Sequence, residues 1–486
     1  PGLSIMEKNW TTVEIEQEFR AQIELALKNI PQVSHISGHM GSTGFDPKVT
    51  EITHRLAREY HLASTDTRLA NGLTGAGYGS LHGTPEEKTA SFLGMLKKLE
   101  AGKNYVFVDH PAWDTPEMRA VHHIGYENVA ADRQGVTELF TSKMVKDEVN
   151  NRGIELISYN DHLKALPRST PENEKVINEK FDVYLKAVAE SKQELHSLMV
   201  LRHGKVVYEK WFGENGPRKN HPMWSVSKTF TATAIGFAVA EKRLTVNDKV
   251  ISYFREELPK EVAPYLADLE IRDLLTMSVG HEKDPTNDIR KENASWEELF
   301  LSTPIMFEPG TKFVYNSLAT YMLSAILQRV TGEKVIDYLY PRLFRPLGIT
   351  GAVWESSPTG VNCGGWGLHV KTEDMAKLGQ FFLQKGKWNG EQLLPEIWFE
   401  EATRAHITQP PVWFPKNGNP KNSDWVQGYG FQMWRCRHNA YRADGANGQF
   451  IIVLPDQDAV VVTTANIQDM QAEINLIWKH LLPAFK

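Results

Sequence analysis

The chain has 486 residues, of which 41% are hydrophobic and 23% are charged, and its net charge is −6. This length exceeds one ordinary hydrophobic core, so we expect at least two domains. The acidic balance excludes a general nucleic-acid surface, no apolar run is long enough to cross a bilayer, and two cysteines do not make a disulfide framework or a cysteine metal cluster.

The first third of the chain alternates helical and strand-like patterns. Apolar residues at steps of three and four predict a helix that ends before Pro31, and the same spacing predicts a second amphipathic helix through residues 49–56. Apolar runs predict strands at 32–36, 104–108 and 154–159, with a helix near 134–150. This alternation is typical of a parallel α/β architecture.

Two histidines follow predicted strands, at the edge where parallel α/β folds place their chemistry. His39 comes shortly after the first strand, and His110 comes shortly after the second. Two imidazoles that converge there could bind a divalent metal such as Zn or Mg. The alternative is that both are ordinary members of a set of 17 histidines.

Three segments of this region resemble motifs of the YdjC-like carbohydrate deacetylases, namely residues 33–41, 56–60 and 109–111. The resemblance covers most of residues 10–165 and implies a barrel-like (β/α) fold, metal-dependent removal of N-acetyl groups from amino sugars, and His39 and His110 as metal ligands. The family's Asp-Asp pair, which supplies a third ligand and the catalytic base, is absent from this segment. We therefore expect residues 1–165 to be a partial barrel-like domain that lacks its N-terminal part, with packing or sugar binding as an alternative to catalysis.

A polar stretch with two prolines at 166–173 predicts a linker to a second domain, residues 174–486. This second part begins and ends with strands. Its predicted elements are a helix near 174–192, two strands about a tight turn within 197–211, strands at 450–455 and 459–464, and a final helix over 470–482. Because the middle is mostly helical, we expect an α+β domain with one antiparallel sheet built from both ends, flanked by helices, plus a helical subdomain.

Ser225 stands three residues before Lys228, at the start of an Ala-rich apolar segment that predicts a buried helix. Residues three apart share a helix face, so the hydroxyl and the amine can meet. The positive end of the helix favours an alkoxide, and a Lys of lowered pKa can take the proton of a Ser. The alternative is an N-cap Ser followed by a solvated Lys, since a Ser-x-x-Lys pattern arises by chance in a chain of this length.

Three downstream features bear on this pair. Tyr315, in a turn before a predicted helix, could share the proton transfer of Lys228 or could simply pack. Gly445 would let a substrate carbonyl lie against bare backbone, where an N–H group could join that of Ser225 in an oxyanion hole. The Gly-rich loop at 364–369 either shapes a pocket wall or forms a plain tight turn.

In this order and spacing, the features resemble the serine β-lactamase and penicillin-binding-protein superfamily, in particular its class C-like esterases, D-peptidases and 6-aminohexanoate-oligomer hydrolases. The resemblance spans about residues 172–486. It implies a transpeptidase-like fold and an acyl-enzyme mechanism. By position it implies Ser225 as the nucleophile, Lys228 as its base partner, Tyr315 as the group that protonates the leaving group, and Ala446 as the second oxyanion donor.

Two positions depart from the superfamily's motifs. Ser317 stands where a Tyr-x-Asn motif has Asn, and Ala443-Asp444-Gly445 replaces Lys-Thr-Gly. The second change removes a cation that holds the β-lactam carboxylate, a contact worth about 1.5–3 kcal/mol, and adds an acid beside the site. We therefore expect a neutral or cationic ester or amide substrate. The residues expected to bind it or its oxyanion are Asp444, Gly445, Ala446, Asn447 and Ser317.

Three functions remain open on the sequence: a serine hydrolase that needs no cofactor, a metal-dependent carbohydrate N-deacetylase in the first domain, and a catalytically inactive glycan- or peptide-binding protein. The oligomeric state, the compartment and the pairing of Cys363 with Cys436 are open too, although the first residues show no signal-peptide pattern. We favour the first function, an esterase, amidase or peptidase rather than a β-lactamase. Its partner would be a small-molecule, peptide or glycan-derived substrate, with no nucleic acid and no membrane span.

Overall fold

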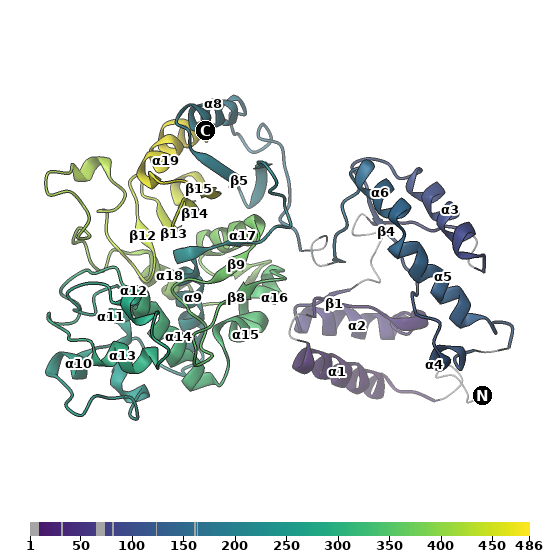
Figure 1. The fold of residues 1–486 in the computed structure, drawn as a ribbon, viewed down its shortest axis with the longest axis horizontal. Coiled ribbons are helices and arrows are strands. Elements are labelled where there is room, and N and C mark those ends of the chain that lie inside the picture. Colours follow the sequence, from purple (N-terminus) through teal and green to yellow (C-terminus); the bar gives the residue numbers. More distant parts are fainter. Residues whose placement is uncertain are drawn as a thin grey trace. The chain divides into compact units, whose positions relative to one another are not determined.

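The computed structural model describes residues 9–30, 33–64, 73–79, 82–122, 124–159, 162 and 164–486. The chain divides into two compact units (Figure 1). Unit 1 is Pro1–Ile23 with Ser34–Leu163, and unit 2 is Glu24–Val33 with Lys164–Lys486. Each unit has hydrophobic clusters of its own.

The described part of the chain before residue 160 forms helices and two short pairs of parallel strands. Its strands are β1 (His35–Ile36), paired with β2 (Ala63–Ser64), and β3 (Leu73–Gly75), paired with β4 (Asn104–Val106). Its helices are α1 (Thr12–Asn29), α2 (Pro47–Glu59), α3 (Pro85–Leu96), α4 (Pro116–Arg119), α5 (Val129–Thr141) and α6 (Lys143–Asn151).

The two predicted N-terminal helices are confirmed, and their apolar faces meet in one cluster that includes Ile15, Val49 and Leu56. The strand pairs are parallel, as expected of an α/β domain. Each pair has only two strands among the described residues, however, so the barrel-like arrangement is not confirmed.

Two predictions for this region are wrong in detail. The single helix expected near 134–150 is two helices, because Ser142 has an extended backbone (ψ 129°) between α5 and α6. The described backbone at 154–159 forms no strand. Ile154 packs against the hydrophobic cluster around Phe92 and Leu139 instead, so burial of its side chain needs no strand partner.

A six-stranded antiparallel sheet organises unit 2. In spatial order its strands are β12 (Trp434–Arg435), β13 (Tyr441–Gly445), β14 (Gln449–Leu454), β15 (Ala459–Asn466), β5 (Glu194–Arg202) and β6 (Lys205–Trp211). Because β15 pairs with β5, strands from both ends of the unit share one sheet, as expected. All residues of β13 and β14 are buried, which is consistent with the continuous apolar run of β14 from Phe450 to Leu454.

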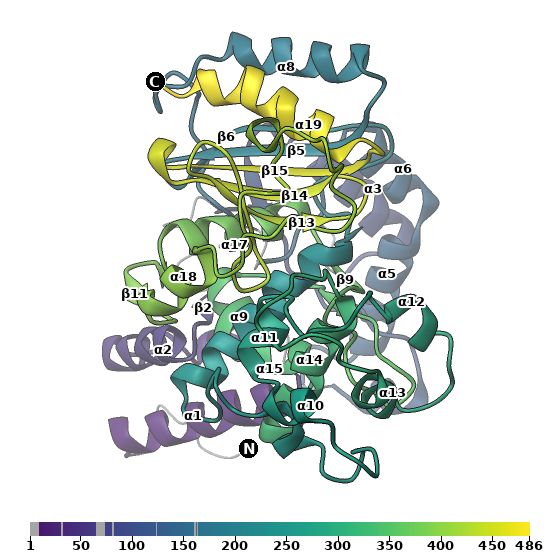
Figure 2. The ribbon, with the colours of Figure 1, turned by 90° about the vertical axis from the view of Figure 1, so that its left-hand side faces the viewer.

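Helices cover both faces of this sheet, as Figure 2 shows. α8 (Glu179–Glu190) and α19 (Met470–Leu476) pack on one face, and α17 (Thr372–Leu383) and α9 (Ser227–Ala240) lie on the other. The final helix predicted to reach residue 482 is α-helical only to Leu476 and then continues as a π-helical turn, Ile477–Leu481.

The helical middle of unit 2 carries a second, three-stranded sheet. Its strands are β7 (His221–Pro222), β9 (Leu368–Val370) and β8 (Val353–Trp354). The other helices are α10 (Pro264–Asp268), α11 (Ile271–Leu275), α12 (Thr286–Ile289), α13 (Trp296–Ser302), α14 (Ser317–Thr331), α15 (Val335–Leu339), α16 (Arg345–Leu347) and α18 (Glu396–Thr403), with β10 (Lys387–Trp388) and β11 (Glu391–Gln392) forming a small hairpin.

The stretch predicted as a linker lies against unit 2. The backbone N–H of Leu166 donates to Glu373, and the guanidinium of Arg168 forms ion pairs with Glu373 at 2.6 Å and Glu209 at 3.0 Å. The beginning of the linker is therefore bound to the surface of the second unit.

Within the described residues, no helix combines the length and the apolar character that a bilayer crossing requires. Cys363 and Cys436 are both buried free thiols, which answers the question of their pairing.

Candidate active site

Ser225 lies in a 3-10 turn, Trp224–Val226, that leads directly into α9. The helix begins at Ser227, two residues later than predicted, and its N-cap residue is Val226, so the N-cap interpretation of Ser225 is wrong. Val226 and Ser227 already have helical backbone angles. Ser225 and Lys228 therefore still share one face, as their spacing predicts.

Lys228 is the centre of the hydrogen bonding around Ser225. Its side chain is only 1% exposed, because α9 is buried along nearly its whole length. The Lys228 Nζ lies 2.7 Å from Ser225 Oγ, 3.0 Å from Ser317 Oγ and 2.8 Å from the carbonyl oxygen of Gly365. These acceptors match the three N–H donors of an ammonium group.

Burial lowers the pKa of Lys228 to about 7, against the opposing attraction of Asp284 and Asp444 for its charged form. Near neutral pH a large fraction of the amine is therefore uncharged. In that state the Nζ lone pair can accept a hydrogen bond from the Ser225 hydroxyl, which is the arrangement that a general base requires.

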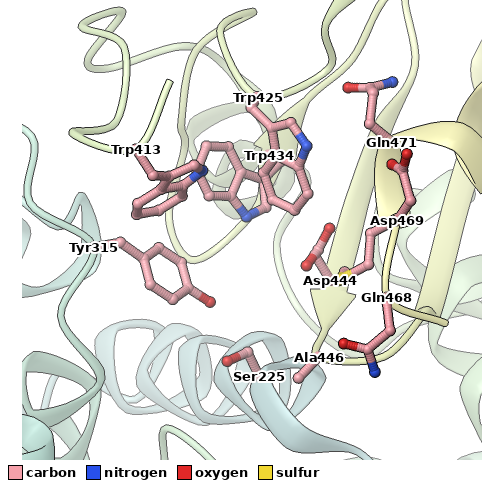
Figure 3. A pocket seen from close by; sticks show the side chains of 11 residues that line it. Ser225, Tyr315, Trp413, Trp425, Trp434, Asp444, Ala446, Gln468, Asp469 and Gln471 are labelled. Atoms are coloured by element: carbon pink, nitrogen blue, oxygen red, sulfur yellow. The ribbon is translucent and has the colours of Figure 1, made fainter. Parts of the chain in front are cut away.

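Tyr315 reaches the same two groups from the segment that precedes α14. Its ring centroid is 4.9 Å from Lys228 Nζ, and its hydroxyl points into the cavity that Ser225 lines (Figure 3). Burial raises the pKa of Tyr315 far above its usual value, and the neighbouring Asp444 carboxylate adds to the rise. The phenol therefore keeps its proton at neutral pH.

Two glycines allow the backbone to come close to this cluster. A Cβ at Gly445 would lie 2.3 Å from the carbonyl oxygen of Met223, so β13 can lie beside the Ser225 turn only without a side chain there. A Cβ at Gly365 would lie 2.5 Å from the carbonyl oxygen of Ser317. The Gly-rich loop therefore lies directly against the start of α14. At this place the carbonyl oxygen of Gly365 accepts a hydrogen bond from Lys228.

A cavity of about 430 Å³ opens above Ser225 (Figure 3). Figure 3 shows Ser225 and Ala446 together at its floor, Tyr315 with its hydroxyl directed inward, and the tryptophans along one wall. Among the described residues that line it, two are acidic and none is basic. The lining consists of Ser225, Tyr315, Trp413, Trp425, Trp434, Asp444, Ala446, Gln468, Asp469, Met470 and Gln471.

The structure places most of the predicted site residues together. Ser317, at the first position of α14, contacts Lys228, and Asp444 and Ala446 line the cavity. Asn447 has a left-handed backbone (φ 63°) in the turn after β13, and its carbonyl oxygen accepts from the N–H of Ile467. Its observed contact thus joins the turn between β13 and β14 to the residue that follows β15.

Sequence reasoning missed Arg442, which lies behind the wall of the cavity. Its side chain is fully buried, and its Nε donates to Asp444 at 2.7 Å while Nη1 donates to the carbonyl oxygen of Asp424 at 2.8 Å. Its guanidinium also lies 4.5 Å from the ring centroid of Trp425. Burial raises the pKa of Asp444, and Arg442 opposes that rise, so the acid beside the site has a cationic partner.

The 13 tryptophans of the chain, many of them in its second half, suggest aromatic-lined pockets, but sequence reasoning did not identify those that form this wall. Trp413 and Trp425 lie on the long connection between α18 and β12, and Asp424 anchors that connection. Burial alone would raise the pKa of Asp424, but hydrogen bonds from Arg437, Gln471 and Trp478 and the charge of Arg442 hold it at about 2. The high tryptophan count was the only signal in the sequence, because these residues have no regular spacing.

The predicted metal ligands in the first unit are both exposed. His39 lies in a 3-10 turn, and His110 follows Asp109, whose carboxylate accepts from Tyr78 Oη at 2.6 Å and from the N–H of His110 at 2.8 Å. In the part of the chain that the structure describes, no group of three or more His, Cys, Asp or Glu side chains is placed to hold a metal ion. The expected donor set is thus not assembled here, and no chemistry is assigned to a metal.

Solved structures share the fold of the second unit. The octameric penicillin-binding protein homologue from Pyrococcus abyssi aligns with a TM-score of 0.50 and 19% identity over 63% of this chain and 77% of that one. A penicillin-binding protein homologue from Caulobacter crescentus gives a TM-score of 0.50 and 16% identity over 64% of this chain and 97% of that one.

The chain belongs to the Beta-lactamase family, whose model matches residues 189–482. A second model, YdjC-like protein, matches residues 2–151. Among curated relatives, the 6-aminohexanoate-dimer hydrolase of Paenarthrobacter ureafaciens is 24% identical over 293 residues, which are 56% of this chain and 73% of that protein.

Replacing Arg442 by Met tests the charge arrangement behind the cavity. The substitution would leave the buried Asp444 carboxylate without its cation, so we expect the free energy of unfolding, measured by urea denaturation, to fall by about 3–5 kcal/mol.

The matched control is Arg435→Met on the neighbouring strand β12, where the half-buried guanidinium bonds to backbone carbonyls and Asn439. We expect it to cost about 1 kcal/mol or less. Adding Asp444→Asn to R442M should recover part of the loss, because the unpaired charge is then gone. Equal losses of unfolding free energy in R442M and R435M would contradict the pairing of Arg442 with the buried Asp444 carboxylate.

Proposed function

We propose that unit 2 is a serine hydrolase that acts through an acyl-enzyme on a neutral or cationic ester or amide, as an esterase, amidase or peptidase rather than a β-lactamase. The observation that carries this proposal is the buried Lys228 amine, with its pKa lowered to about 7, within 2.7 Å of Ser225 Oγ at the floor of an open cavity. A solvated lysine would stay protonated at neutral pH and could not take the proton of a serine. A curated relative named as a hydrolase agrees with this reaction class.

In the proposed first step, the Ser225 hydroxyl gives its proton to Lys228 Nζ while Oγ attacks the carbonyl carbon of the substrate. The carbonyl oxygen becomes an oxyanion, which the backbone N–H groups of Ser225 and Ala446 stabilise. Their shared position at the cavity floor supports this pairing (Figure 3). Donors aimed at a developing oxyanion usually contribute the largest part of catalysis in acyl transfer.

In the second step, the leaving group departs with a proton from the Tyr315 hydroxyl, and the proton on Lys228 restores that hydroxyl. The inward direction of the Tyr315 hydroxyl in the cavity that Ser225 lines supports this role, and burial keeps the phenol protonated at neutral pH (Figure 3). Water then attacks the carbonyl carbon of the acyl-enzyme and gives one proton to Lys228 Nζ. The bond between that carbon and Ser225 Oγ breaks, the proton on Lys228 passes to Oγ, and the acid product leaves.

The charges of the cavity support the choice of substrate. Its described lining has two carboxylates and no basic side chain, and Arg442 lies buried behind the wall, where it is paired with Asp444. A substrate carboxylate would meet like charges there. The tryptophan wall offers faces that suit an apolar group or, through cation–π attraction, an ammonium group.

The first test is covalent labelling by a fluorophosphonate probe. We expect the full chain to take up one label and Ser225→Ala to take up none, because the reactive oxygen is gone. Hydrolysis of a p-nitrophenyl ester should fall by at least about 10³-fold in the same variant. Ser227→Ala is the matched control at the neighbouring serine, whose Oγ accepts from the N–H of Leu368, and it should keep the label. Labelling of S225A at the wild-type rate would refute the proposal.

The pH dependence of catalysis tests the role of Lys228. Its amine acts as a base only when deprotonated, so kcat/KM for a neutral ester should rise with pH through about 7 and then level off. Asp444 favours the protonated amine and thereby raises the pKa of Lys228. Asp444→Asn should therefore move this rise to lower pH.

Asp456→Asn, at an exposed acid in the turn after β14, is the control and should leave the midpoint in place. A midpoint that stays unchanged in D444N, or that moves to higher pH, would show that Lys228 does not govern the profile.

Substrate charge can be varied with p-nitrophenyl esters whose acyl chains have the same length and end in methyl, trimethylammonium or carboxylate. We expect the carboxylate ester to have a kcat/KM at least about 10-fold below the other two, which corresponds to about 1.4 kcal/mol. Benzylpenicillin should be hydrolysed more slowly than the neutral ester. Equal rates for the carboxylate and neutral esters, or for penicillin and the neutral ester, would overturn the inference about charge.

A further inference from the structure

A second cavity of about 440 Å³ lies in unit 2, and its lining shares no residue with that of the Ser225 cavity. Its tryptophans are Trp224, Trp296 and Trp366, and its lining also includes Arg290, Glu355, His369 and the thiol of Cys363. Trp366 and His369 belong to the Gly-rich segment at 364–369, for which the sequence leaves open a pocket wall or a plain tight turn. This volume lies within the usual range for small-molecule sites.

The indole groups are held in place by the surrounding structure. Trp296 is buried, and its ring centroid lies 5.8 Å from that of Trp366 at an interplanar angle of 34°. Trp354 Nε1 donates to the carbonyl oxygen of Trp366 at 2.9 Å. Gly367 has a φ of 85°, and a Cβ there would lie 2.7 Å from Glu355 Cβ, so the loop fits closely against β8 and its following residues. The aromatic surface is therefore formed without a ligand.

Trp224 remains accessible, with 42% of its surface exposed and a left-handed φ of 47°. A bulky residue seldom adopts this conformation, and such residues concentrate at functional sites. An exposed indole beside a half-buried one gives the cavity flat apolar surface that water contacts unfavourably.

The polar residues of the cavity balance in charge. Arg290 is exposed and cationic, and Glu355, with 57% of its side chain exposed, is anionic and lies 3.7 Å from His369 Nε2. The cavity therefore offers hydrogen-bond donors and acceptors with no formal excess of either charge. This composition favours a neutral ligand with many hydroxyl groups over an anion or an ammonium group.

We propose that this cavity binds a neutral pyranose sugar ring whose hydroxyl groups are all equatorial. Such a ring has apolar C–H groups on both faces, which fit against indole rings, and its hydroxyls project from its edge, where Arg290, Glu355 and His369 can bond to them. A lipid chain would leave those polar groups without partners, and a charged ligand would not match their balance.

This inference goes beyond hydrolysis, because sugar binding requires neither Ser225 nor Lys228. The two cavities are nevertheless close along the chain. Trp224 directly precedes Ser225, and Trp366 directly follows Gly365, whose carbonyl oxygen accepts from Lys228. A sugar bound in the second cavity would contact Trp224 and Trp366, which are the chain neighbours of Ser225 and Gly365.

Isothermal titration of the full chain with cellobiose tests the proposal. We expect saturable binding, at least about 10-fold weaker in Trp366→Ala and in Arg290→Ala, since each loses one kind of sugar contact. β-1,4-Galactobiose, whose C4 oxygen is axial on each ring, should bind at least about 3-fold more weakly than cellobiose.

Trp413→Ala, which removes an indole from the Ser225 cavity, is the matched control and should keep the affinity for cellobiose. Because Arg290 is exposed, its variant reports on binding even if Trp366→Ala fails to fold. The absence of saturable cellobiose binding, an unchanged affinity in R290A, or an equal loss in W413A and W366A would each overturn the proposal.

Discussion

The arrangement of the candidate active site depends on the burial of one amine. Lys228 lies on a helix that the core encloses, where an ammonium group is costly and its pKa falls to about 7. Its partners come from three separate parts of the chain: the turn before α9, the first residue of α14 and the Gly-rich loop. Each of these segments must keep its place for the amine to be satisfied, so one hydrogen-bonding centre joins elements that lie far apart in sequence.

The large sheet supplies the second side of the site. β13 ends beside the Ser225 turn because Gly445 has no side chain to collide with Met223, and Ala446 thereby reaches the cavity floor. On the same strand, the guanidinium of Arg442 donates hydrogen bonds to Asp444 and to the carbonyl oxygen of Asp424. Asp424 belongs to the connection between α18 and β12, which carries two tryptophans of the cavity wall. The charge beside Ser225 and the shape of the aromatic wall therefore depend on one buried guanidinium.

The pairing of Arg442 with Asp444 revises a simple interpretation of the motif at residues 443–445. Ala443 stands where the Lys-Thr-Gly motif has lysine, so the cavity lacks that cation, as the sequence indicates. Asp444 stands where the motif has threonine, but its carboxylate is paired with Arg442 and is not an isolated negative charge. Arg442 and Asp444 stand two apart on one strand and so share a face, a signal that the alternation of a strand contains. Which face the pair occupies depends on β14 and β12, which flank β13 in the sheet.

The sequence by itself determined the local elements and the reactive pair. Periodicity defined the helices α1 and α2 and the strands at both ends of unit 2, and the spacing of Ser225 and Lys228 required only one turn of helix to bring them together. Tertiary structure alone decided the rest. The described backbone at 154–159 formed no strand, Ile154 packs against the hydrophobic cluster around Phe92 and Leu139, and a single helix became two at Ser142. Likewise, Arg442, Asp424 and the tryptophans meet only through contacts between distant segments, and the lowered pKa of Lys228 arises from burial, which no short motif specifies.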